Sequence, residues 1–201
     1  MPFPVSHEES HRRFLPQVRH LHLPLQSGSS DILKKMNRRY TKEDYLKLVD
    51  KLRRACPDIS LTTDIIVGFP GETEEEFAES RSFVDSIGFY ETHIFPYSRR
   101  EGTKAADMPD QLPEQIKKER CRELIELGKK HRTEYMQHFL GQEKTVLFEE
   151  MQTIAEEEYW VGHTMEYLKV GVKTNQNLEN KMEVVKVKNI LQEEILVGEI
   201  G

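Results

Sequence analysis

Two segments of the chain carry side chains that could bind a small nucleoside-like ligand. Gln26 and Ser27 come directly after one predicted strand, and Asp64 lies within the next. Gln26 and Asp64 could each hydrogen-bond the hydroxyl groups of a ribose. Arg38, which follows the first segment, could hold a carboxylate through two parallel hydrogen bonds. These residue types therefore suggest a site for a ligand that carries both a ribose and a carboxylate.

Two glycines of the second segment, Gly68 and Gly71, extend this hypothesis. A glycine has no Cβ, so a flat group such as adenine could approach the backbone there. Gln-Ser-Gly and Gly-x-Pro-Gly sequences are also typical of ordinary tight turns. From the residues alone, a ligand site and plain turns are both open.

The predicted elements would bring these residues together. Hydrophobic periodicity and capping-box spacing at Thr41 and Thr73 predict alternating strands and helices. The strands are expected over 18–25, 59–67 and 89–95, and the helices over 30–36, 41–56, 73–87 and 113–139. Parallel strands joined by helices bind ligands at their carboxyl ends. Because only three strands are visible, we expect a further strand or another chain to pair with the first.

After Gly141 the pattern changes to short strands separated by polar turns. These strands are predicted over 144–148, 159–161, 169–172, 182–187 and 195–197, which is compatible with a five-stranded barrel. We therefore expect three parts: an irregular segment over 1–19, an α/β domain over 20–139, and a small β-barrel over 140–201.

Charge is distributed unevenly along the chain. The net charge is −6, and residues 140–201 account for all of it with six lysines and twelve glutamates. An acidic segment does not attract a phosphate backbone by bulk charge, so RNA binding there would need a local basic and aromatic patch. The candidates are Lys169, Lys173, Lys181, Lys186 and Lys188, with Tyr159, Trp160 and Tyr167. The alternative is an ordinary solvated barrel surface.

Several classes of protein are not favoured by the sequence. No apolar run approaches the length of a membrane helix, and no signal pattern opens the chain, so we expect a cytoplasmic protein without membrane contact. Two cysteines, Cys56 and Cys121, are too few for a disulfide framework or an all-cysteine metal site. Residues 7–11 fit the H-E-x-x-H zinc-protease pattern. They lie between Pro4 and Pro16 with no room for supporting structure upstream, so we expect no metal site there.

Four ordered motifs resemble one known family. They are LPLQSGS (23–29), KMNRRY (35–40), TDIIVGFPGET (63–73) and FPYSRREGT (95–103). Together they are similar to the second half of the radical S-adenosylmethionine (SAM) methylthiotransferases. The most similar branch acts on threonylcarbamoyladenosine beside the tRNA anticodon. Members of this family end in a small RNA-binding β-barrel, the TRAM domain, which WVGHTMEY (160–167) resembles.

The resemblance implies a fold and a set of ligands. The fold would be α/β: the C-terminal half of a parallel (βα) radical SAM partial barrel, followed by an OB-like TRAM barrel. Arg38 would bind the carboxylate of SAM and Asp64 its ribose, and tRNA would be the substrate. By motif position, the SAM-binding residues would be Gln26, Ser27, Arg38, Asp64, Gly68 and Gly71. The RNA-binding residues would come from the barrel patch, chiefly Lys169, Lys173, Lys186, Lys188 and Tyr167.

The chain also departs from the family. Its members hold a four-iron four-sulfur (4Fe–4S) cluster on Cys-x3-Cys-x2-Cys in an earlier loop and a second cluster on three further cysteines. Cys56 and Cys121 match neither set. The resemblance therefore implies a fragment that lacks its N-terminal half and makes no radical alone. A non-enzymatic RNA-binding module and an inert truncated product stay open as alternatives.

Overall fold

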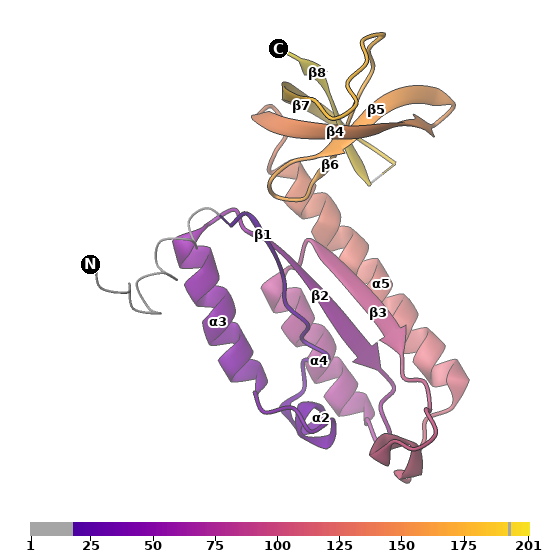
Figure 1. The fold of residues 1–201 in the computed structure, drawn as a ribbon. Helices are drawn as coiled ribbons and strands as arrows, with labels where there is room; N and C mark the ends of the chain where they lie inside the picture. Colours follow the sequence, from indigo (N-terminus) through magenta and orange to yellow (C-terminus); the bar gives the residue numbers. More distant parts are fainter. Residues whose placement is uncertain (1–17, 193) are drawn as a thin grey trace, which may run out of the picture. The chain divides into compact units, whose positions relative to one another are not determined.

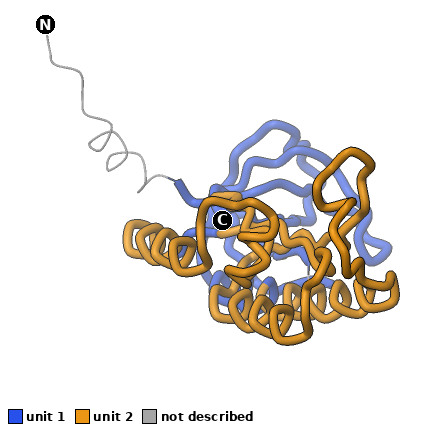
Figure 2. The backbone as a smooth tube through the Cα atoms, turned by 90° about the horizontal axis from the view of Figure 1, so that it is seen from below, with its two compact units in different colours: residues 1–20, 58–60, 132–201 blue, residues 21–57, 61–131 orange. Residues whose placement is uncertain are grey.

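A computed structural model describes residues 18–192 and 194–201 of the chain. The chain divides into two compact units, shown in separate colours in Figure 2. We call residues 21–57 and 61–131 the sheet unit. The described residues of the barrel unit are 18–20, 58–60, 132–192 and 194–201. The long helix α5 (Glu114–Gln137) contributes to both units, so this division falls within α5, whereas the sequence placed the boundary at 139/140.

The sheet unit has the α/β architecture that the sequence predicted (Figure 1). Its three strands lie in the order β1-β2-β3, and β2 and β3 are parallel, with Asp64 opposite His93. The strands are β1 (His20–His22), β2 (Ser60–Val67) and β3 (Glu91–Pro96). The helices are α2 (Ser30–Lys35), α3 (Lys42–Ala55), α4 (Glu74–Ile87) and α5, with a short 3-10 helix η2 (Lys104–Asp107) after β3.

Local sequence signals place the helix boundaries. Thr41 and Thr73 each accept a hydrogen bond from the backbone of the third helical residue, whose carboxylate bonds back to the cap. Both predicted capping boxes are therefore confirmed. Gly88 ends α4 in the left-handed conformation, as its position in the sequence predicted.

Strand β1 is shorter than its predicted range of 18–25. Leu23 still donates its N–H to the carbonyl of Thr62 at 2.8 Å. Pro24 has no N–H to contribute to the ladder. Gln26 then rejoins β2 as an isolated parallel bridge with Ile65. The proline therefore divides the expected strand into a short β1 and a single bridge at its carboxyl end.

The two faces of the sheet differ in burial. On one face of β2, Leu61, Ile65 and Val67 are almost completely buried, and they form part of the core of the sheet unit. On the other face, Asp64 is half-buried and Phe95 is exposed. Alternate residues of a strand point to opposite faces, so this second face carries the side chains available to a ligand.

The barrel unit contains the closed five-stranded barrel that the sequence predicted, in the order β4-β5-β6-β8-β7. The strands are β4 (Glu143–Ile154), β5 (Glu157–His163), β6 (Lys169–Val172), β7 (Met182–Leu191) and β8 (Ile195–Ile200). Most are longer than predicted. In β4, exposed glutamates and a bulge between Phe148 and Glu150 break the apolar alternation that marks a strand.

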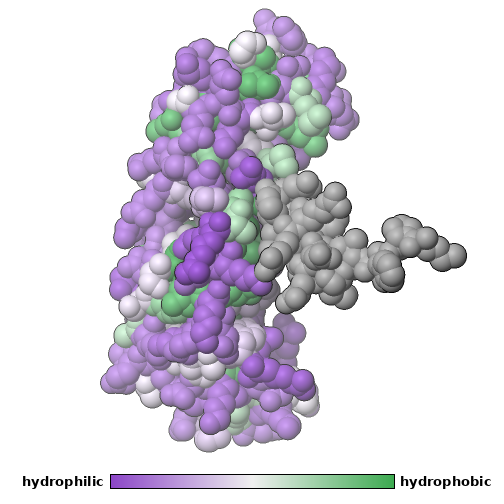
Figure 3. Space-filling model, turned by 90° about the vertical axis from the view of Figure 1, so that its left-hand side faces the viewer, coloured by the Kyte–Doolittle hydropathy of each residue, from purple (hydrophilic) through white to green (hydrophobic). Residues whose placement is uncertain are grey.

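One face of the surface is predominantly polar (Figure 3). Figure 3 shows a largely hydrophilic face with separate apolar patches, in keeping with a mean hydropathy of −0.66. Within the described ranges, no helix is both long enough and apolar enough to cross a membrane. The H-E-x-x-H segment at residues 7–11 lies outside the described residues.

Candidate functional site

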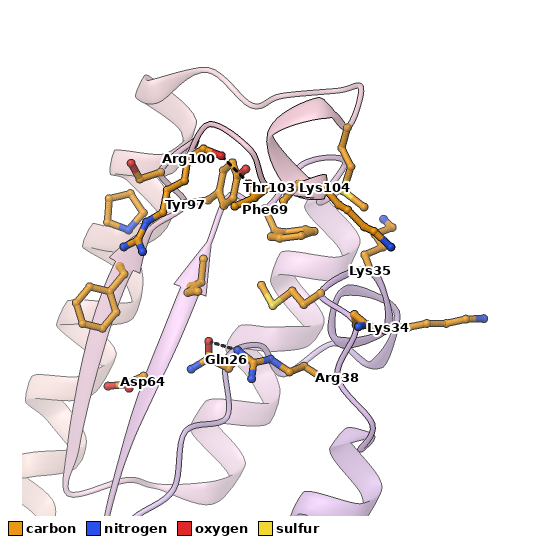
Figure 4. A pocket seen from close by; sticks show the side chains of 18 residues that line it. Gln26, Lys34, Lys35, Arg38, Asp64, Phe69, Tyr97, Arg100, Thr103 and Lys104 are labelled. Atoms are coloured by element: carbon orange, nitrogen blue, oxygen red, sulfur yellow. Dashed lines mark hydrogen bonds between the residues drawn. The ribbon is translucent and has the colours of Figure 1, made fainter.

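A pocket of about 890 Å³ lies in the sheet unit where the strands end (Figure 4). Three of the six predicted ligand-binding residues line it: Gln26, Arg38 and Asp64. They come from the segments that follow β1 and α2 and from β2 itself. Ligand-binding clefts of proteins commonly have volumes of about 300–1,000 Å³, so this pocket could take a nucleoside-sized ligand.

Gln26 has an unusual backbone conformation. Its φ of +69° lies in the left-handed region, which non-glycine residues rarely occupy. Its N–H donates to the carbonyl of Asp64 at 2.8 Å, and its own carbonyl accepts from the N–H of Ile66 at 2.9 Å. Its side-chain Oε1 accepts from Arg38 Nη2 at 3.0 Å. The backbone thus holds Gln26 in a strained position, and such strain is commonly found at ligand sites.

Asp64 has two histidine neighbours. Nε2 of His22 lies 3.4 Å from Asp64 Oδ2, and Nδ1 of His22 lies 2.9 Å from Thr62 Oγ1. Potential metal-ligand atoms of His22, Asp64 and His93 all lie within 4.8 Å of one another. These are donor types that suit zinc. Of the three residues, only Asp64 lines the pocket.

Ser27, Gly68 and Gly71 do not line the pocket. Ser27 is buried, and its hydroxyl accepts a hydrogen bond from the N–H of Ser29. Gly68 has a φ of +72°, and a Cβ added there would lie 2.5 Å from Cγ of Lys117. The Lys117 side chain thus lies where a Cβ at Gly68 would be, and the expected approach of a flat ligand to Gly68 stays a prediction. In this structure Gly68 permits a turn and close packing.

No pattern in the sequence predicted the buried charged network at the end of β2. Glu72 Oε2 accepts hydrogen bonds from the N–H of Gly68 at 2.7 Å and from Arg120 Nη1 at 2.6 Å. Arg120 also bonds Glu74 at 3.1 Å. Burial raises the pKa of Glu72 above its ordinary value, and the hydrogen bonds from Gly68 and Arg120 oppose that shift. The network ties α5 to the turn after β2.

The sequence patterns also did not identify several other residues that line the pocket. Phe95 and Tyr97 come from the end of β3, and Arg100 and Lys104 follow in the next segment. Their motif, 95–103, contributed only to the family resemblance. Nothing in the spacing of a polar loop indicates that it folds over the end of a sheet.

The predicted RNA-binding residues of the barrel do not form one free basic face. Lys169 donates to Gln152 at 2.8 Å, Lys173 pairs with Glu157, and Lys188 pairs with Glu199 at 3.2 Å. Lys186 lies on β7, which β8 separates from β6.

The aromatic part of the predicted patch is also limited. Tyr159 and Trp160 are buried. Tyr167 is half-exposed, but the ring of His163 stacks on it with 4.9 Å between centroids. The aromatic surface that a nucleobase could reach on these residues is therefore smaller than the sequence predicted.

Comparison with known proteins identifies the family. Residues 7–84 match the model of the radical SAM superfamily. The threonylcarbamoyladenosine tRNA methylthiotransferase of Bacillus subtilis is 44% identical over 172 residues, which are 85% of this chain and 38% of that protein. The tRNA-2-methylthio-N(6)-dimethylallyladenosine synthase of Acetivibrio thermocellus is 44% identical over 171 residues, 85% of this chain and 35% of that protein. The chain thus spans little more than a third of the length of these relatives.

A further relative agrees with these two. The synthase of the same name from Oceanobacillus iheyensis is 54% identical over 130 residues, 65% of this chain and 25% of that protein. The solved structure of coproporphyrinogen III oxidase from Escherichia coli, a radical SAM enzyme, is a distant likeness. It has 15% identity and a TM-score of 0.49 over 89% of this chain and 44% of that one. These sequence matches show that the chain belongs to the radical SAM tRNA methylthiotransferase family.

Proposed function

We propose that the pocket of the sheet unit binds SAM for methylthio transfer to a modified adenosine of tRNA. The observation that carries this proposal is the convergence of Gln26, Arg38 and Asp64 on one pocket in a member of this family. Arg38 would bind the carboxylate of SAM, and Asp64 would accept hydrogen bonds from the ribose. Gln26 would position the Arg38 guanidinium through the 3.0 Å bond between them.

The chain does not supply a set of ligands for an iron–sulfur cluster. Such clusters are held by several cysteine thiolates, and the sequence has only Cys56 and Cys121. Cys56 is buried. Burial, and then the nearby charge of Glu72, raise the pKa of the Cys121 thiol, which disfavours the thiolate. Cluster ligands would therefore come from a polypeptide segment outside these 201 residues, such as the N-terminal half that the resemblance implies.

The relatives are named for two different modified adenosines. Relatives named for threonylcarbamoyladenosine and for dimethylallyladenosine match this chain at the same 44% identity over nearly equal lengths. We therefore propose an adenosine derivative in tRNA as the substrate. The barrel of residues 140–201 is proposed to be a TRAM-like RNA-binding domain, and a tRNA-modifying role fits the cytoplasmic location expected from the sequence.

Calorimetric titration with SAM tests the role of the pocket. Replacing Arg38 by glutamine removes a charge-assisted hydrogen bond worth about 1.5–3 kcal/mol, so the Kd should rise about 10- to 100-fold. Asp64→Ala should also weaken binding. Arg122→Gln, an exposed α5 position that does not line the pocket, is the control and should leave the Kd unchanged.

Two results would contradict the proposal. One is an equal Kd for wild type and Arg38→Gln. The other is absence of SAM binding both by the chain and by a fusion that places it behind the N-terminal part of the B. subtilis relative. RNA binding without SAM binding would instead favour the non-enzymatic RNA-binding alternative.

A further inference from the structure

The pocket carries more positive charge than SAM requires. Among its lining residues, five are cations and only Asp64 is acidic, in a chain whose net charge is −6. The cations are Lys34, Lys35, Arg38, Arg100 and Lys104, all labelled in Figure 4. SAM offers one carboxylate and carries two positive groups, its ammonium and its sulfonium. One cation meets that carboxylate, and additional cations would repel the rest of the ligand.

Two of the five cations already have partners. Arg38 donates to Gln26, and Lys35 donates to the carbonyl of Gly71 at 2.9 Å and to Glu76 at 3.0 Å. The other three are exposed, and their side chains make no hydrogen bond or ion pair with any described residue. We call these three the pocket rim: Lys34, Arg100 and Lys104.

We propose that the pocket rim binds phosphate groups of single-stranded RNA whose base enters the pocket. Arginine and lysine are the usual phosphate-binding side chains, and unpaired ones give up no existing ion pair on binding. Phe95, half-exposed at the same pocket, offers a ring on which an unstacked base could lie. Cations beside an exposed aromatic ring are the combination that single-stranded RNA recognition uses.

The barrel offers less to a phosphate. Of its six lysines, Lys169, Lys173 and Lys188 are each bonded to a neighbouring side chain, two of them to glutamates, and Lys144 pairs with Glu166. An RNA phosphate would have to displace those carboxylates. Only Lys181 and Lys186 make no such bond with a described residue, against three unpaired cations at the pocket rim. The charge distribution therefore favours the pocket rim over the barrel lysines as the main electrostatic contact for RNA.

The salt dependence of RNA binding tests this inference, which rests on the proposed function for the choice of RNA as ligand. The 201-residue chain is titrated into a fluorescein-labelled single-stranded oligoribonucleotide of about eight nucleotides, and anisotropy is recorded between about 50 and 200 mM NaCl. Each neutralised phosphate contributes a slope of about −0.7 to log K against log salt for a single strand. The triple variant Lys34→Gln/Arg100→Gln/Lys104→Gln should therefore reduce the slope by about 2 and weaken low-salt binding at least about tenfold.

A matched control separates a local contact from bulk charge. Lys51→Gln/Lys118→Gln/Arg122→Gln removes two lysines and one arginine at exposed positions that do not line this pocket, and it should leave slope and affinity near wild type. Equal losses in both triple variants, or no loss in the rim variant, would overturn the inference. A loss confined to Lys186→Gln on β7 would assign the contact to the barrel instead.

SAM titration of the rim variant should show unchanged or tighter binding. Failure of SAM binding with rim-dependent RNA binding intact would refute the proposed function alone.

Discussion

Glu72→Ala tests the charged network at the end of β2. The side chains of Glu72 and Arg120 are only 1% and 6% exposed, and their charged atoms lie 2.6 Å apart. Removal of the carboxylate leaves the Arg120 guanidinium buried without its nearest counter-charge and leaves the N–H of Gly68 without its acceptor. Both losses act on the same turn.

The magnitude follows from these contacts. Removing one partner of a buried ion pair costs about 3–5 kcal/mol. Glu74, which is 76% exposed, still bonds Arg120 at 3.1 Å, so the ion-pair loss should be at the lower end of that range. The unpaired Gly68 N–H adds about 1 kcal/mol. We expect the free energy of unfolding of the sheet unit to fall by about 4 kcal/mol, a large share of the about 5–15 kcal/mol typical of a protein.

Two spectroscopic probes give the assay its specificity. Helices α2, α3 and α4 belong to the sheet unit, so circular dichroism at about 222 nm during urea unfolding reports mainly on that unit. Trp160, the single tryptophan, lies on β5 of the barrel unit, so its fluorescence reports on the barrel. Glu72→Ala should lower the urea midpoint of the transition followed by circular dichroism. The midpoint followed by Trp160 fluorescence should stay near that of wild type.

Two further variants test whether the buried Glu72–Arg120 pair stabilises the turn after β2. Glu74→Ala removes the exposed partner of Arg120 and should cost less than about 1 kcal/mol. Glu72→Met/Arg120→Met removes both buried charges and should recover at least about half of the loss, because no unpaired buried charge remains. A Glu72→Ala loss below about 1 kcal/mol, or a double variant less stable than the single one, would show that the network does not stabilise this turn.

Two predictions concern the barrel. A Cβ at Gly162 would lie 2.0 Å from the backbone oxygen of Leu147, so Gly162→Ala should force β4 and β5 apart and destabilise the barrel by about 3 kcal/mol; unchanged unfolding by Trp160 fluorescence would contradict this. Burial opposes ionisation of Glu166, but its 3.0 Å bond to Lys144 and further hydrogen bonds outweigh that effect and hold its pKa below the ordinary 4.5. A lowered folded-state pKa stabilises the fold above the unfolded-state pKa, and this contribution is lost as pH falls below about 4.5. Barrel stability should therefore fall over that acid range by less in Glu166→Gln than in wild type, and equal pH profiles would refute the role of this carboxylate.

Much of the fold could be predicted because its signals are local. The capping boxes at Thr41 and Thr73 depend on residues three positions apart, and both form as expected. The five barrel strands were recognised from short apolar alternations, although the bulge between Phe148 and Glu150 concealed the full length of β4. Boundaries were least accurate where a single residue, such as Pro24, interrupts a ladder.

Long-range contacts set the limit of prediction for the site. Gln26, Arg38 and Asp64 could be assigned to one cleft because parallel strands end at the same edge of a sheet. The bond between Glu72 and Arg120 joins residues 48 positions apart, and neither charge has a pattern that marks it as buried. Likewise, Lys117 fills the space beside Gly68 only because α5 packs there.

The distribution of cations shows why counting charges along a sequence can mislead. Although residues 140–201 carry the whole net charge of −6, the lysines there were predicted to bind RNA because aromatic residues accompany them and the segment resembles a TRAM domain. Folding pairs several of those lysines with nearby side chains, whereas it gathers Lys34, Arg100 and Lys104 at one pocket, where they have no partner among the residues that the structure describes. Affinity for a phosphate depends on local unpaired charge, because paired cations are already neutralised and exposed distant ones are screened by salt. The proposed RNA contact should therefore be tested first at the pocket rim.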